Sequence, residues 1–371
     1  MRRHALWLPA LAALLVGCGK EETPPAAHPM TTATDNAQTG ATATESTLDM
    51  VGKATKPYKI VLIVKTKNNP FFLPMIAAFE ETAKKLGVEA EVQAAAQESS
   101  YEQQVALVQT EVSKGVNAIL ITPADSKALV PALKKAADAG VLIINLDNRL
   151  DPDTVKAQNL ALGGYVGADN MTGGEKAGLA LLEAVGPDEK TAIAEASASA
   201  DAKGQKKDYR VQVAILEGIR GVDNAEARKK GFLLAVGQRL HVVATETGEW
   251  ETEKAYNKTL AILAAYPNIK GIFCANDNMA IGAMKAISEK GKRGLVKVVG
   301  YDDIPGVTGA INSGEMTATI EQHPDLMGGY GLKMAVGILD GSIKKGGEVL
   351  VMLETIKRLS VIQRSEAPRT P

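Results

Sequence analysis

Short runs of apolar residues alternate with longer amphipathic stretches from Tyr58 onward. The apolar runs cover residues 59–64, 118–122, 141–146, 211–216, 271–275 and 295–300. A continuous apolar run predicts a strand that is buried on both faces, and strands that alternate with helices predict parallel βαβ units. The pattern therefore predicts an α/β chain, and it is long enough for two such sheets.

Polar residues recur directly after these strands. They are Lys65, Asn69, Asp147, Asn148, Arg149, Arg228, Asn276, Asp277, Asp302, Asp303, Gln322 and His323. In open parallel sheets, ligands bind in the crevice outside the carboxyl ends of the strands. Helix capping is the local alternative, because Asp and Asn are favoured at the N-cap. Arginines such as Arg149 and Arg228 cannot cap in this way, so the recurrence favours a ligand-binding crevice.

The first of these strand ends carries an aromatic pair. In the segment KTKNNPFFLPM, Phe71 and Phe72 stand side by side, although the chain has only five phenylalanines. Carboxylates, guanidinium groups and amides can bind sugar hydroxyls, while the C–H face of a sugar ring packs on aromatic rings such as these two and Trp250. The alternative is a hydrophobic wedge at the corner, with Asn69 as N-cap and Pro70 at the first helical position. We expect one phenylalanine to be partly structural and the other to face the ligand.

The N-terminus predicts export. A short basic segment precedes an apolar run that is too short to span a bilayer and fits a signal peptide of residues 1–17. The run ends in LVGC, which resembles the bacterial lipobox and predicts that Cys18 is acylated and becomes the new N-terminus. An ordinary signal peptide with an incidental cysteine is the alternative. Cys274, the other cysteine, then has no partner, and we expect it to be a small buried hydrophobe.

Two segments are predicted to lie outside the packed core. Residues 18–57 are rich in Thr, Ala and Pro, contain no Ile, Phe or Trp, and show no helical or strand period. Such a segment cannot bury enough apolar surface to offset its ordering entropy, so we expect a flexible tether. A polar, alanine-rich stretch, residues 188–210, is expected to project from the second unit as a loop or solvated helix, and we assign it no function.

Composition and missing motifs exclude several function classes. A net charge of −1 and the lack of a basic run argue against a nucleic-acid partner. The chain has no Walker loop, dinucleotide glycine fingerprint or Gly-x-Ser-x-Gly elbow, and none of its histidines has metal-ligand spacing to another histidine or a cysteine. We therefore expect no catalytic residue, no metal and no cofactor, and a small or neutral ligand.

Six motifs resemble, in this order, those of the periplasmic pentose- and hexose-binding proteins of ABC importers, with ribose- and allose-binding proteins nearest. They are VKTKNNPFF, INLDNRLD, NAEARKKGF, FCANDNMAIGA, VVGYDDIPG and TATIEQHP. The resemblance runs over residues 58–363 and implies two Rossmann-like lobes that are joined by three crossing strands and close over a sugar. Carried over motif by motif, the ligand residues are Lys65, Asn69, Phe71, Phe72, Asp147, Asn148, Arg228, Trp250, Asn276, Asp302 and Gln322.

The same resemblance implies the division of the chain. The N-terminal lobe is expected to comprise residues 58–168 and 323–353, and the C-terminal lobe residues 169–322 and 354–363, before a tail of residues 364–371. The hinges are expected near Asp169, Gln322 and Glu354.

Two positions depart from the ribose-binding pattern. Ribose binders usually carry a small hydroxyl residue where Lys65 stands, whereas the allose binder has lysine. The position of Asn148 is an arginine in ribose binders and an acid in the allose binder. These differences favour a hexose or a related polyol over ribose.

The resemblance and the predicted acylation of Cys18 together imply a monomeric, lipid-anchored receptor on the extracytoplasmic face. It would capture a monosaccharide or sugar alcohol and deliver it to an ABC permease in the inner membrane. The alternative is an extracytoplasmic sugar sensor that serves a membrane kinase or chemoreceptor. Sugar-responsive repressors share the fold, but they need a DNA-binding helix-turn-helix where this chain has a signal and a tether.

Overall fold

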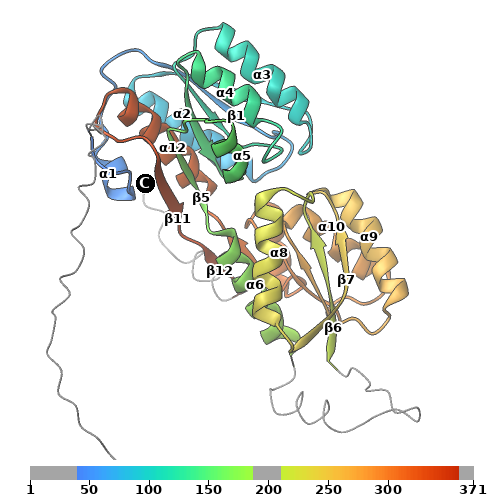
Figure 1. Ribbon diagram of the computed structural model, residues 1–371. Coiled ribbons are helices and arrows are strands. Elements are labelled where there is room, and N and C mark those ends of the chain that lie inside the picture. The colour runs from blue at the N-terminus through green and yellow to red at the C-terminus, as the bar shows by residue number, and fades with distance from the viewer. Residues whose placement is uncertain (1–39, 187–209, 359–371) are drawn as a thin grey trace, which may run out of the picture. The chain divides into compact units, whose positions relative to one another are not determined.

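The computed structural model describes residues 40–186 and 210–358. The expected signal peptide, Cys18 and residues 364–371 lie outside the described residues, as does all of the expected projecting segment except Arg210. Both expected sheets are present (Figure 1), which confirms the α/β fold. Within the described ranges, no helix has the length and apolar character needed to cross a membrane.

The first lobe is built on a parallel six-stranded sheet in the order β11-β5-β4-β3-β1-β2. Its strands are β1 (Lys59–Val64), β2 (Glu89–Ala94), β3 (Ala118–Ile121), β4 (Leu142–Leu146), β5 (Gly164–Ala168) and β11 (Gly347–Val351). Along β1, Ile60 and Leu62 belong to one core cluster, whereas Val61 and Ile63 belong to another. Successive side chains point to opposite faces of a strand, so a strand covered on both sides is apolar throughout.

Helices cover both faces of this sheet. The Ile60 face packs against α2 (Phe72–Leu86) and α12 (Pro324–Leu339). The Val61 face packs against α3 (Tyr101–Ser113), α4 (Val130–Asp138) and the flank of α5 (Pro152–Ala157).

The second lobe is built on a parallel four-stranded sheet in the order β7-β6-β8-β9. Its elements are β6 (Val211–Glu217), β7 (Leu240–Thr247), β8 (Gly271–Cys274), β9 (Lys297–Val299), α6 (Asn170–Val185), α8 (Asp223–Val236), α9 (Thr252–Ala265), α10 (Asp277–Glu289), the 3₁₀ turn η1 (Pro305–Val307) and α11 (Thr308–Ser313). Cys274 is fully buried in β8, which agrees with the prediction of a small hydrophobe.

Helices α6 and α8 approach each other closely through a pair of glycines. A Cβ atom at Gly174 would lie 2.1 Å from the carbonyl oxygen of Arg228, and one at Gly231 would lie 2.0 Å from that of Met171. Real Cβ contacts are never this short, so glycine is required at both positions. The two glycines therefore fix the distance from α6 at which Arg228 is held.

Within the described residues, the chain passes between the lobes three times. It crosses after β5, at Asp169, again between β10 (Thr319–Glu321) and α12, and finally between β11 and β12 (Glu354–Ile356). Strand β10 pairs antiparallel with β12, with Glu321 opposite Glu354. Each residue expected to mark a hinge therefore stands at or beside one of these crossings.

Part of the expected tether is folded, because residues 40–57 pack against the first lobe. They include α1 (Glu45–Asp49), whose Leu48 is fully buried beside α12, and Ala41 forms a β-bridge with Ile343. The backbone N–H of Thr55 donates to a carboxylate oxygen of Asp340 at 3.1 Å. Local composition could not reveal this, because the partners of the segment lie almost three hundred residues further along the chain.

Candidate functional site

A small cavity of about 20 Å³ lies between residues of the two lobes. It is lined by Lys65, Asn69, Phe71, Phe72, Glu98, Asp147, Asn224, Arg228, Trp250, Asn276, Asp302 and Gln322. These include every expected ligand residue except Asn148, and two residues, Glu98 and Asn224, that the sequence analysis missed.

The ends of parallel strands supply much of this lining. Lys65 follows β1, Asp147 follows β4, Asn276 lies just beyond β8 and Asp302 just beyond β9. Parallel strands end at a common edge of their sheet, so polar residues that follow them converge there.

Three lining residues hold a left-handed backbone that is uncommon outside glycine. The φ angles are 56° at Asp147, 68° at Trp250 and 114° at Asp302. Such conformations persist only where the surrounding structure holds them, and they cluster at functional sites.

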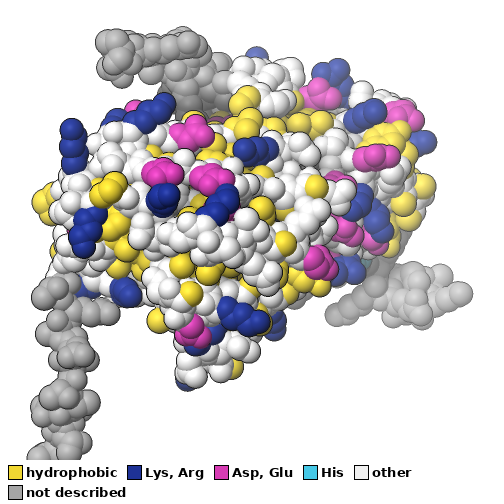
Figure 2. Space-filling model, turned by 90° about the horizontal axis from the view of Figure 1, so that it is seen from above, with side chains coloured by type: hydrophobic (Ala, Val, Ile, Leu, Met, Phe, Trp, Pro, Cys, Tyr) yellow, Lys and Arg dark blue, Asp and Glu magenta, His cyan; other side chains and the backbone are white. Residues whose placement is uncertain are grey.

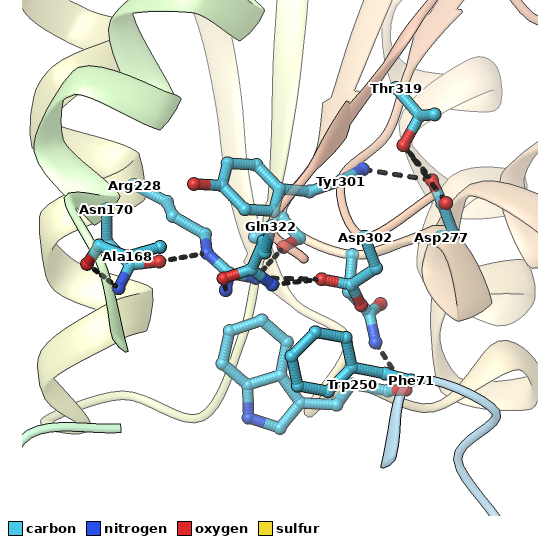
Figure 3. A network of polar contacts seen from close by, with 12 residues as sticks. Phe71, Ala168, Asn170, Arg228, Trp250, Asp277, Tyr301, Asp302, Thr319 and Gln322 are labelled. Atoms are coloured by element: carbon cyan, nitrogen blue, oxygen red, sulfur yellow. Dashed lines mark hydrogen bonds and ion pairs between the residues drawn. The ribbon is translucent and has the colours of Figure 1, made fainter. Parts of the chain in front are cut away.

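Arg228 is the centre of a polar network in the second lobe (Figure 3). Its Nε donates to Asn170 Oδ1 at 2.8 Å, Nη1 to the carbonyl oxygen of Ala275 at 2.8 Å and Nη2 to Gln322 Oε1 at 3.0 Å. Gln322 Nε2 in turn donates to Asp302 Oδ1 at 2.6 Å, and that oxygen lies 3.5 Å from Arg228 Nη1. The guanidinium group is therefore fixed in position by three segments before any ligand binds.

Aromatic rings surround this guanidinium group. Arg228 Cζ lies 3.8 Å from the centroid of the Tyr301 ring and 5.6 Å from that of Trp250, while Lys65 Nζ lies 5.8 Å from Trp250. Cations are attracted to the faces of aromatic rings at these distances. Trp250 thus lies within reach of both buried cations of the cavity.

The first lobe contributes a second polar group. Asn69 Oδ1 accepts from the N–H of Phe71 at 3.0 Å, and Asn69 Nδ2 donates to Glu98 Oε1 at 2.7 Å. Lys65 Nζ lies 4.0 Å from the other oxygen of Glu98. Glu98 follows β2, whose sequence EAEVQA is too polar to be recognised as a strand, so the strand-end pattern did not reach it.

Phe71 and Phe72 form an edge-to-face pair, with ring centroids 5.1 Å apart. Phe72 begins α2 and is almost completely buried, and Phe71 precedes that helix. Both rings line the cavity, so they close the strand–helix corner and border the site at once. Asn69 stands three residues before α2 and accepts a hydrogen bond from the N–H of Phe71, so it forms a turn ahead of the helix. The N-cap residue is Phe71, so the expectation that Asn69 caps the helix is wrong.

Two buried polar atoms of the cavity lack a hydrogen-bond partner. They are Nε1 of Trp250, a donor, and Oδ1 of Asn224, an acceptor. Both side chains are at least nine-tenths buried. Leaving a buried polar group unpaired is costly, so a free donor and a free acceptor in one cavity indicate a polar ligand.

Burial raises the pKa of the three carboxyl groups in the cavity. Desolvation raises the pKa of Glu98 and of Asp147, against the attraction of Lys65. Desolvation also raises the pKa of Asp302 to about 7, although the neighbouring Arg228 opposes the change. In each of these carboxyl groups, burial favours the neutral form and a neighbouring cation, Lys65 or Arg228, favours the charged form.

Two neighbouring polar residues have structural roles. Asn276 caps α10, because its Oδ1 accepts from the N–H of Met279 at 3.0 Å, and it still lines the cavity. Asp277 is fully buried and accepts from the N–H groups of Tyr301 at 2.9 Å and Ile304 at 3.1 Å. It thereby holds the turn that presents Asp302.

Asn148 lies beside the cavity and outside its lining. Its Nδ2 donates to the carbonyl oxygen of Pro123 at 2.8 Å, and its Oδ1 accepts from the N–H of Asn224 at 3.3 Å. Both ends of this side chain are therefore already in contact with protein.

One histidine lies between two glutamates near the crossings. His323 Nδ1 is 3.5 Å from Glu321, and His323 Nε2 is 3.9 Å from Glu354. Among the described residues, the side chains of Glu321, His323 and Glu354 come close enough to one another to share a cation. The three side chains come from β10, the start of α12 and β12.

Known proteins resemble this chain over most of its length. The periplasmic binding protein domain family matches residues 60–343. The D-ribose/D-allose-binding protein of Pseudomonas aeruginosa is 31% identical over 80% of this chain and 88% of its own length. The D-allose-binding periplasmic protein of Escherichia coli is 32% identical over 80% of this chain and 87% of its own.

Solved structures agree with these relatives. A periplasmic solute-binding protein of an ABC transporter from Actinobacillus succinogenes, with bound D-allose, is 39% identical and has a TM-score of 0.72 over 82% of this chain and 99% of its own. A solute-binding protein from Agrobacterium vitis, with bound D-fucose, is 26% identical and has a TM-score of 0.71 over 84% of this chain and 97% of its own.

Proposed function

The chain belongs to the periplasmic binding protein family, and from this premise we propose that it binds a monosaccharide between its lobes and delivers it to an ABC importer. The observation that carries the proposal is the cavity, in which buried cations, buried carboxyl groups and aromatic rings surround an unpaired donor and an unpaired acceptor.

Each lining group matches a part of a sugar. Carboxyl groups of Asp147 and Asp302 accept from hydroxyls, and the guanidinium group of Arg228 donates to them. The indole N–H of Trp250 and the Oδ1 of Asn224 supply the remaining donor and acceptor, which are unpaired without a ligand. The ring of Phe71 packs against the apolar C–H face.

We propose a hexose of the allose type as the ligand, ahead of a pentose or a sugar alcohol. The D-allose-bound structure from Actinobacillus succinogenes supports this choice, as does Lys65 at a position where the resembling ribose binders carry a small hydroxyl residue. Lys65 is 97% buried and adds a donor that reaches into the cavity from the first lobe.

Both lobes already line the cavity, so separation of the lobes would open the site to a sugar. Gln322 lies on a crossing and also lines the cavity, where it bonds Arg228 and Asp302. We propose hinges at Asp169, Gln322 and Glu354, and a working unit that is a monomer held at the extracytoplasmic face of the membrane by acylated Cys18.

A ligand screen tests the proposal. Purified protein is titrated with D-allose, D-ribose, D-fucose and a set of sugar alcohols, while thermal unfolding and the emission of Trp250 are recorded. A ligand in thousandfold excess over its Kd stabilises the folded state by about 4 kcal/mol. If no sugar or polyol shifts the unfolding of well-folded protein or the emission of Trp250, the proposed function is wrong.

A further inference from the structure

Helix α8 begins without a cap of its own. Its N-cap residue is Val222, whose apolar side chain makes no capping hydrogen bond. The first N–H groups of a helix have no partner within the helix and need one from elsewhere. Here they find it in the other lobe: the N–H of Asp223 donates to Ser126 Oγ at 3.1 Å, and that of Asn224 to Asn148 Oδ1 at 3.3 Å.

The two acceptors are buried and held by their own lobe. Ser126 is 97% buried and its carbonyl oxygen accepts from the N–H of Asp151 at 2.8 Å. Asn148 is completely buried, and its carbonyl oxygen accepts from Asn145 Nδ2 at 2.8 Å. The acceptors are therefore preorganised, and little entropy is lost when α8 meets them.

An electrostatic attraction acts at the same place. Arg149 of the first lobe is fixed by Glu348, 2.7 Å from its Nη2, and by the ring of Tyr165, 3.7 Å from its Cζ. Burial raises the pKa of Asp223, which stands in the first turn of α8, and the positive charge of Arg149 opposes this rise. A cation is thus set opposite an acid across the same lobe contact.

We propose that Ser126 and Asn148 cap α8 across the cleft and act as positioning residues that set the affinity for sugar without touching it. The proposal rests on the proposed sugar-binding function. Helix α8 carries both Asn224 and Arg228, which line the cavity, so the contact that caps the helix also places these groups. When the lobes separate, the cap is lost. The free energy that the cap contributes therefore favours the closed state over the open state.

Affinity measurements on capping variants test this inference. A helix cap contributes enough for its removal to change an equilibrium constant by about two- to thirtyfold. We expect Ser126→Ala and Asn148→Ala each to weaken binding within that range, by the same factor for every sugar bound, mainly through faster dissociation. Ser126→Thr keeps an acceptor and should stay near wild type.

Thr44→Ala is the matched control. Thr44 caps α1, accepting from the N–H of Thr47 at 3.2 Å, and both groups belong to the first lobe and do not line the cavity. Its loss should lower the unfolding temperature and leave sugar affinity unchanged. The inference is overturned if Ser126→Ala/Asn148→Ala binds within twofold of wild type. It is also overturned if Asn148→Ala changes the ranking of sugars, because Asn148 would then contact the sugar itself.

A second measurement needs no sugar and separates this inference from the proposed function. In a Cys18→Ser background, Ser126→Cys and Asp223→Cys leave the buried Cys274 as the only other thiol. We expect mild oxidation to join this pair in the sugar-free protein, whereas Ser126→Cys paired with the remote Ser313→Cys should stay reduced. Failure of the first pair to cross-link would overturn the lobe contact, even if sugar binds.

Discussion

Arg228 and Asp302 are ionisable residues of the cavity that are buried, and burying a charged group costs free energy. Arg228 makes three hydrogen bonds at once and lies 3.5 Å from Asp302. Both side chains are almost completely buried, so removing one leaves the other unpaired. Breaking such a pair is strongly destabilising, because the remaining charge is uncompensated.

We expect Asp302→Asn and Arg228→Lys each to weaken sugar binding by tenfold or more. Truncating one partner of a buried hydrogen-bonded charge pair costs about 2–5 kcal/mol, and a lysine cannot reproduce three directed donors. Asp303→Asn is the control, because Asp303 shares a left-handed backbone with Asp302 but does not line the cavity. Calorimetric titration decides the matter. An essential Asp303, or a dispensable Arg228, would refute the assignment of this lobe.

Asp302 should also make stability depend on pH. Its pKa is about 7 in the folded state and 3.8 ordinarily, so the folded protein binds a proton that the unfolded chain releases. The contribution is fully present below pH 3.8 and is lost as the pH rises through about 7. At about 1.4 kcal/mol per pH unit, the loss is about 4 kcal/mol.

Urea unfolding of sugar-free protein at pH 5 and pH 8 measures this effect. Asp302→Asn cannot titrate, so its free energy of unfolding should fall less between the two values than that of wild type. Glu98 and Asp147 contribute in the same direction in both proteins, because burial raises their pKa too. An equal fall in the two proteins would show that Asp302 is ionised throughout.

Whole elements determine where these residues stand. Helix α8 is held against α6 by Gly174 and Gly231, and it is capped by residues of the other lobe. The segment of residues 40–57 lies against α12, which runs from a crossing back into the first lobe. The position of each element is therefore set by contacts with elements distant in sequence.

Gly174→Ala tests the glycine contact. The added methyl group would lie 2.1 Å from the carbonyl oxygen of Arg228, so α6 and α8 must separate. We expect a loss of about 1–3 kcal/mol in unfolding free energy, as for other overpacked sites, together with weaker sugar binding. Gly309→Ala is the control, since nothing lies within 4 Å of the added atom in helix α11, and it should stabilise slightly. Equal stabilities in thermal unfolding would refute the argument.

At the scale of the whole molecule, three crossings join two lobes that share one cavity. Gln322 belongs to a crossing and to the site at once, so bending there moves a group that holds both Arg228 and Asp302. On the face shown in Figure 2, positive and negative side chains are interspersed.

We expect acylated Cys18 to attach the whole protein to the membrane. We expect Cys18→Ser, expressed in a bacterial host, to move the protein from the membrane fraction to the soluble one, because an acyl chain supplies the hydrophobic anchor. Fractionation and lipid labelling check the outcome. A mutant that still pellets with membranes and carries the label would show that the anchor lies elsewhere.

The sequence by itself determined the α/β class and much of the site. Both signals can be read from short segments of sequence. A strand that is buried on both faces must be apolar, and ligands bind outside the carboxyl ends of parallel strands, where the polar residues stand. Lys65, Asp147, Arg228 and Asp302 were therefore located from the pattern alone, and the family motifs selected them as ligand residues and left out Arg149, Asp277, Asp303 and His323.

Only the tertiary structure decided the remainder, because it depends on pairs of residues that are distant in the chain. Glu98 enters the cavity because an edge strand with a polar sequence ends beside Asn69. Asn148 lies outside the cavity lining, and its Oδ1 accepts a hydrogen bond from the N–H of Asn224 in the second lobe. Residues 40–57 pack against α12 and Asp340 by burying Ala43 and Leu48 and by hydrogen bonding to Asp340, and these partners lie far along the chain.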